Sequence, residues 1–312
     1  MLDFALSPAS VAVKGYAAVS YRAPLWVRAL LAWDRLAIRT ENIRVSLIDE
    51  ALLAWVRPDD RAALTATVYA DQKVYLPGGI RFQSGLFEWE RRARDSPLFP
   101  RSGRVLLGAA GGGRELSALL SRGFSVVAFE PCAPFADAGK ELVIGSSSTF
   151  VQASYADLVR AVEGRGGPLE LLCQGPRFDA IILGWGSFSH VMPSSERLAL
   201  LRALRALGGA APVLLSFALE PEPGSVPPGK GRIRTTLQRL FAALGAPGVS
   251  EEGDHFLSNG GFFSFLSQEE LMKLAFVAGY EIALFQELPY PHALLVPESA
   301  GEGPVTEVAK GR

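Results

Sequence analysis

The chain has 312 residues, of which 49% are hydrophobic and 20% are charged, and its formal net charge is −1. This length allows one large hydrophobic core or two smaller ones, and the near-zero charge provides no positive field that would attract nucleic acid or anionic lipid. The two cysteines, Cys132 and Cys173, are too few for a secreted disulfide framework and lack metal-ligand spacing. With no signal peptide and no membrane-length apolar run, we expect a cytoplasmic protein without a metal site.

Residues 1–100 are expected to form a helical N-terminal cap. Pro24 marks a helix start, and the following apolar stripe includes Trp26 and Trp33. Two further helices are predicted over 47–56 and 61–69.

Strand and helix patterns alternate from residue 101 onward. Five strands are predicted over 105–107, 125–129, 150–153, 178–183 and 213–219, and two closing strands over 280–285 and 293–296. This alternation predicts a Rossmann-like α/β fold: a doubly wound, mostly parallel seven-stranded sheet with helices on both faces. The core would comprise residues 101–219 and 266–297, and the closing strands would form a hairpin.

Residues 220–265 interrupt this pattern and are interpreted as an insertion. They contain several prolines, a basic run with Lys230, Arg232 and Arg234, one amphipathic helix and an aromatic-rich loop. A loop with this many aromatic residues is expected to pack over a pocket as a lid, or against the cap. Residues 298–312, rich in Gly, Glu and Pro, are expected to form a flexible tail.

A glycine-rich turn follows the first core strand. The apolar run over 105–107 breaks into glycines at 111–113, and a helical pattern restarts at Glu115. Glycines at such a turn let a ligand approach the backbone closely. The next strand ends in Glu130, 19 residues after Gly111, where a carboxylate can accept both hydroxyls of a ribose. Together these features predict a site for a nucleoside-containing cofactor.

With this turn and acid, residues 104–219 and 271–296 resemble the class I S-adenosylmethionine-dependent methyltransferases. The acidic-x-Gly-x-Gly-x-Gly motif of that family falls on Leu107, Ala109, Gly111 and Gly113. Leu107 replaces the acid that usually helps to hold the amino group of the methionine moiety, and Ala109 replaces a glycine. Glu130 matches the acid that binds the ribose.

The resemblance implies that S-adenosyl-L-methionine is bound at the ends of the first four strands. Ser154 lies where the family often has an acid touching the adenine amine, and Trp185 follows the strand that ends beside the transferred methyl group. The expected cofactor-binding residues are Gly108, Ala109, Gly111, Gly113, Glu130, Pro131, Ser154, Gly184, Trp185 and Gly186.

His190, a few residues after the fourth predicted strand, is the candidate general base. It can be neutral near pH 7 and would border the methyl group, although a surface or capping role is the alternative. In methyltransferases with such a cap, the cap selects the acceptor, which implies substrate contacts by Tyr69, Tyr75 and Trp89. His255 and Phe262 of the insertion are further candidates for substrate binding.

The resulting hypothesis is methyl transfer from S-adenosylmethionine to a small-molecule acceptor. One alternative is an NAD(P)-dependent oxidoreductase, which shares the glycine turn and the ribose-binding acid but not the closing strand pair. The other is a non-catalytic scaffold of degenerate methyltransferase fold, suggested by Leu107 and Ala109, in which the basic run would be a docking surface.

Overall fold

The computed structural model describes residues 25–221, 230–248, 250–251 and 253–298. Its main element is a seven-stranded sheet with the order β3-β2-β1-β4-β5-β9-β8. The first five strands are parallel, and β9 runs antiparallel to both β5 and β8. The strands are β1 (Arg104–Gly108), β2 (Ser125–Glu130), β3 (Thr149–Gln152), β4 (Ala180–Leu183), β5 (Val213–Ser216), β8 (Tyr280–Gln286) and β9 (His292–Pro297). The predicted doubly wound sheet and its closing hairpin are confirmed.

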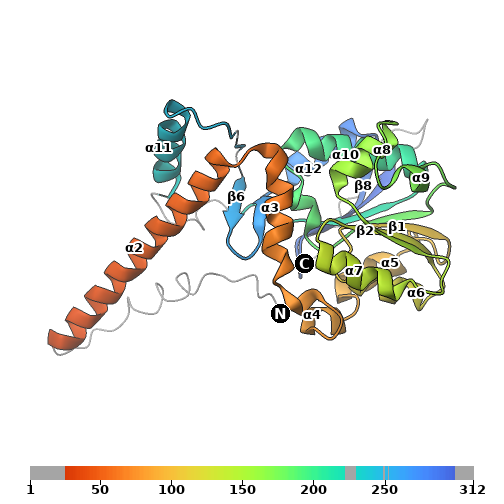
Figure 1. Cartoon of the computed structure of the whole chain (residues 1–312), viewed down its shortest axis with the longest axis horizontal. Helices are drawn as coiled ribbons and strands as arrows, with labels where there is room; N and C mark the ends of the chain where they lie inside the picture. Colours follow the sequence, from red (N-terminus) through yellow and green to blue (C-terminus); the bar gives the residue numbers. More distant parts are fainter. Residues whose placement is uncertain (1–24, 222–229, 249, 252, 299–312) are drawn as a thin grey trace.

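Helices cover both faces of the sheet (Figure 1). One face carries α8 (Tyr155–Val162), α10 (Ser194–Gly208) and α12 (Gln268–Val277), and the other carries α5 (Glu88–Asp95), α6 (Arg114–Leu120) and α7 (Ala133–Leu142); α9 (Glu170–Cys173) lies between α8 and β4. Successive side chains of a strand point to opposite faces, so Leu106 packs in one core and Leu107 in the other. Burial of both faces explains why these strands are continuous apolar runs.

The N-terminal cap consists of α2 (Leu25–Trp55), α3 (Pro58–Ala70), η2 (Lys73–Tyr75) and α4 (Ile80–Gln83). The sequence predicts two helices where the structure has the single 31-residue α2. No glycine or proline interrupts this stretch, so nothing in it stops the helix before Pro58. In Figure 1, α2 extends away from the sheet. Among the described residues, no helix combines the length and apolarity needed to cross a bilayer.

The insertion packs against the cap. It contains α11 (Lys230–Ala243) and a hairpin of β6 (Asp254–Leu257) and β7 (Gly261–Ser264), where the sequence predicts an aromatic-rich loop. A short turn containing Asn259 and Gly260 joins the strands, and this turn chemistry is the signal that indicates a hairpin. Phe256 and Phe262 of the hairpin form a buried cluster with Leu53 of α2.

Part of the predicted basic run connects the insertion to the cap. The Nε atom of Arg234 lies 3.3 Å from Glu50 Oε1, and its Nη2 donates to the backbone oxygen of Asp254 at 2.8 Å. Arg234 therefore joins α11 to α2 and β6. The side chains of Lys230 and Arg232, the predicted helix start at Pro24, and residues 299–312 of the predicted tail lie outside the described residues.

Replacing Phe256 by alanine should destabilise the protein by about 3 kcal/mol, because its ring is 6% exposed and leaves a cavity between the hairpin and α2. The control is Phe276→Ala on α12, where the ring is 72% exposed and the change should stay within about 0.5 kcal/mol. Urea unfolding followed by circular dichroism measures both. Equal losses would contradict the packing of the hairpin on the cap.

Candidate active site

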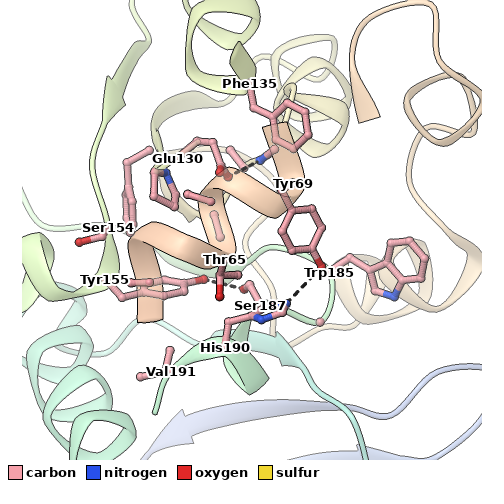
Figure 2. Close-up of a pocket in the computed structure, with 18 of the residues that line it drawn as sticks. Thr65, Tyr69, Glu130, Phe135, Ser154, Tyr155, Trp185, Ser187, His190 and Val191 are labelled. Carbon is pink, nitrogen blue, oxygen red and sulfur yellow. Dashed lines mark hydrogen bonds between the residues drawn. The ribbon is translucent and has the colours of Figure 1, made fainter. Parts of the chain in front are cut away.

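A cavity of about 390 Å³ lies at the carboxyl ends of the parallel strands. Its walls come from the turns after β1, β2, β3 and β4, from α3 and α4 of the cap, and from the start of α10. In Figure 2, α3 crosses the cavity and presents Thr65 and Tyr69 to it. Open α/β sheets bind ligands in this crevice, and the volume is in the range of small-molecule sites.

Most of the candidate site residues identified from the sequence lie together at this cavity. Those that line the cavity are Tyr69, Tyr75, Ala109, Gly111, Glu130, Pro131, Ser154, Trp185, Gly186 and His190. Those outside its wall are Trp89, Gly108, Gly113, Gly184, His255 and Phe262. Trp89 is buried beside the rings of Tyr290 and His292, and His255 packs on Phe263.

The glycines of the turn after β1 have different roles. Gly111 has a φ of +55° and has no atom within 4 Å of the position of an added Cβ, so it leaves space for a ligand. Gly113, with a φ of +96°, is the N-cap of α6. A Cβ on Gly112 would collide with the backbone oxygen of Tyr75, so Gly112 lets the cap approach the turn.

Two glycines outside the cavity wall allow close packing behind it. A Cβ on Gly184 would collide with the backbone oxygen of Ala109, at the point where the turns after β1 and β4 meet. A Cβ on Gly108 would lie 2.6 Å from Cε1 of Tyr155. The Tyr155 ring therefore packs directly over the end of β1, and its hydroxyl is hydrogen-bonded to Ser187 Oγ at 2.6 Å.

Glu130 joins the turns after β1 and β2. Its Oε2 accepts a hydrogen bond from the Gly111 backbone N–H at 2.9 Å (Figure 2), and its Oε1 accepts one from Cys132 N–H at 2.9 Å. Burial raises the pKa of the Glu130 carboxyl to about 7, although the two backbone hydrogen bonds favour its ionised form. A buried carboxylate that lines the cavity is thus held in a fixed position.

A second group of charges lies beside the start of α6. Arg114 donates from Nη1 and Nη2 to the two carboxylate oxygens of Glu90, each at 2.6 Å, and from Nη2 to Glu115 Oε1 at 2.5 Å. All three side chains are buried, but only Arg114 and Glu115 line the cavity. Burial raises the pKa of Glu90 to about 7, and the charge of Glu115 adds to this shift. When both acids are ionised, the group has a net negative charge.

His190, in η3 (Ser187–His190), lies next to Tyr69 of the cap (Figure 2) and also contacts the insertion. Its Nδ1 lies 2.6 Å from the backbone oxygen of Phe262, and its Nε2 lies 3.2 Å from the hydroxyl of Tyr69. Because a carbonyl only accepts, Nδ1 has the proton and Nε2 accepts from Tyr69. Burial lowers the pKa of His190 and raises that of Tyr69, so both are neutral at pH 7.

Ser154 is the N-cap of α8. Its Oγ accepts from Asp157 N–H at 3.2 Å and donates to Asp157 Oδ2 at 2.8 Å. The hydroxyl of Ser154 therefore already has a partner.

Trp185 packs against Phe87, with the ring centroids 4.8 Å apart, and the guanidinium of Arg81 lies 5.4 Å from its ring. An arginine of the cap thus lies beside Trp185.

The sequence reasoning missed several residues of the cavity wall, including Thr65, Arg81, Arg114, Glu115 and Ser187. Thr65 and Arg81 belong to cap helices, and no local sequence pattern indicates which core residues these helices contact. Glu115 had a signal, since it is an acid in the first turn of a helix that follows a glycine turn.

Comparisons with known proteins identify similar folds but no family. No protein-family profile matches the chain, and no curated protein sequence is significantly similar to it. Among solved structures, the amino pentose methyltransferase CalS10 from Micromonospora echinaspora is 15% identical, with 70% of this chain and 94% of that chain covered and a TM-score of 0.46. The sugar N-methyltransferase KedS8 from Streptoalloteichus sp is 16% identical, covering 68% and 86%, with a TM-score of 0.45.

Replacing Ala109 by glycine should stabilise the protein by about 0.5–1 kcal/mol, because Ala109 has a φ of +49°, a left-handed conformation that is unfavourable for a residue with a Cβ. The matched control is the neighbouring Ala110→Gly. Ala110 is buried and has no such φ, so this change should destabilise by about 1 kcal/mol. Thermal unfolding of both variants measures the difference, and a destabilising Ala109→Gly would show that this backbone conformation is not strained.

Proposed function

We propose that this protein is an enzyme that transfers a methyl group from S-adenosylmethionine to a small-molecule acceptor. The observation that carries the proposal is the buried carboxylate of Glu130, hydrogen-bonded to the glycine turn and exposed to a cavity at the carboxyl ends of the sheet. A carboxylate in this position suits the two hydroxyls of a ribose.

The order of the strands supports the fit of an extended nucleoside. Ser154 after β3, Glu130 at the end of β2, Gly111 after β1 and Trp185 after β4 follow one another across the sheet, and all four line the cavity. With the ribose at Glu130, the base would lie towards Ser154 and the reactive end towards β1 and β4. The open side of Gly111 provides the space that the ribose requires.

The sulfonium of S-adenosylmethionine supplies an already activated methyl group. The protein then has to align the acceptor and exclude water. Helix α3 covers the cavity, and its side chains Ala62, Thr65, Ala66 and Tyr69 form part of the wall. The cap therefore encloses the acceptor side of the site, where an apolar small molecule would be held.

We assign the removal of a proton from the acceptor to His190. Its Nε2 has the lone pair, and Tyr69 donates to that lone pair. When an acceptor hydroxyl or ammonium gives its proton to the Tyr69 oxygen, Tyr69 passes its own proton to Nε2, and His190 becomes the imidazolium. The carbonyl of Phe262 continues to accept from Nδ1 throughout.

The closing strands favour this function over that of an NAD(P)-dependent oxidoreductase, because the antiparallel pair β8 and β9 is not expected in a dinucleotide-binding sheet. A non-catalytic scaffold would have no need for a cavity in which His190 is held in one tautomer. The cavity and His190 therefore support an enzyme.

Calorimetry should detect binding of S-adenosylmethionine and S-adenosylhomocysteine but not of NADH. Glu130→Ala should weaken binding by about 1–3 kcal/mol, because the ribose hydroxyls lose their acceptor. Glu141→Ala, on an exposed residue of α7 outside the cavity, is the matched control and should bind as the wild type does. Binding of NADH alone would favour the oxidoreductase, and binding without turnover on any acceptor would favour the scaffold.

His190→Asn should lower the rate of methyl transfer by about 10²–10⁴-fold while cofactor affinity is retained. The assay follows the labelled methyl group of S-adenosylmethionine into a panel of small phenols, alcohols and amines. Because burial lowers the pKa of His190 below that of a free imidazole, the wild-type rate should be constant near neutral pH and should fall only in the acidic range, as the base is protonated. An unchanged rate in the variant would remove His190 from the chemistry.

A further inference from the structure

The end of β1 lacks an acid where the proposed cofactor has an ammonium group. Leu107 occupies the motif position of the acid that usually holds this group, and its side chain is fully buried in the core beneath α6. A core leucine offers no hydrogen-bond acceptor. If the cofactor is bound as proposed, another group must compensate the charge of the ammonium.

The geometry indicates where the ammonium would lie. With the ribose at Glu130 and the base towards Ser154, the amino-acid end would extend towards β1 and β4, where residues at the start of α6 line the cavity. Among the residues that line this end, Glu115 has a carboxylate and is 5% exposed. It belongs to the first turn of α6, directly after the glycine turn.

When Glu90 and Glu115 are both ionised, the charge around Glu115 is unbalanced. Arg114 bonds to Glu115 and to both oxygens of Glu90, so one guanidinium faces two carboxylates. Glu130, on the same cavity, is a third acid close enough for Glu115 to affect its titration. A cation bound here would reduce the repulsion among the three carboxylates.

A cation suited to the carboxylate of the cofactor's methionine moiety lies nearby. Arg81 of α4 lines the cavity with its guanidinium beside Trp185, and it forms no salt bridge with any residue that the structure describes. An acid and an arginine at one end of a cavity are complementary to a zwitterion.

We propose that Glu115 binds the ammonium group of the cofactor's methionine moiety, so that the acid absent from the end of β1 is replaced from the first turn of α6. This inference depends on the proposed function, because it assigns a residue within the same cofactor site. Glu115 contacts the ligand but takes no part in the chemistry of transfer.

The test uses two ligands that differ in the amino-acid end. S-adenosylhomocysteine has this end, whereas 5′-deoxy-5′-methylthioadenosine lacks it. In calorimetric titrations, Glu115→Gln should weaken S-adenosylhomocysteine by about tenfold or more and leave methylthioadenosine within about twofold. Glu90→Gln is the matched control: it removes the other carboxylate partner of Arg114, but Glu90 does not line the cavity, so the ratio of the two affinities should stay unchanged.

A ligand-side measurement applies even if Glu115→Gln does not fold. The analogue of S-adenosylhomocysteine with hydrogen in place of its amino group should bind the wild type about tenfold or more weakly than S-adenosylhomocysteine does, and this comparison needs no variant. When Glu115→Gln folds, it should abolish the difference. The inference is overturned if the wild type does not distinguish the two, or if Glu115→Gln weakens both original ligands equally. If the wild type binds none of the adenosine ligands, the proposed function fails as well; if it binds them but Glu115→Gln changes nothing, only this inference fails.

Discussion

The backbone of a single residue, Phe262, connects three parts of the chain. Its N–H donates to Thr65 Oγ1 of α3 at 2.9 Å, and its carbonyl accepts from Nδ1 of His190 at 2.6 Å. Strand β7 thereby connects the cap to the turn after β4. The bond to His190 fixes the tautomer of its imidazole, and the bond to Thr65 links α3 to the same strand. The insertion is therefore a structural part of the site.

The cavity combines an apolar cover with buried acids on the side of the sheet. Ionised carboxylates are costly to bury, and the pKa of both Glu90 and Glu130 is raised to about 7 by that burial. Arg114 compensates only part of the charge around Glu90 and Glu115. When these acids are ionised, a site with this imbalance is complementary to a cationic ligand.

The alternation of apolar strands and helices was sufficient to predict the sheet, its closing pair and the carboxylate at the end of β2, because these features follow from local pattern and spacing. The contacts between the cap, the insertion and the core were not predictable in this way. Nδ1 of His190 is hydrogen-bonded to the backbone oxygen of Phe262. The identity of the Phe262 side chain gives no indication of this role. Glu115 was visible as a helical residue, but its orientation towards the cavity depends on tertiary packing. Helix α2 is a single helix, where two were predicted, because no glycine or proline interrupts it. The insertion forms a hairpin, where a loop was predicted, because a short turn at Asn259 joins its two strands.

Three consecutive glycines follow Ala110, and the outer two, Gly111 and Gly113, have positive φ angles. The middle one, Gly112, faces the backbone of Tyr75, which approaches so closely that no Cβ can be placed there. The turn therefore meets a ligand on one side and the protein's own N-terminal segment on the other. A cap that packs this closely requires a glycine at the middle position of the turn. During evolution, that glycine was present before the cap, or the two arose together.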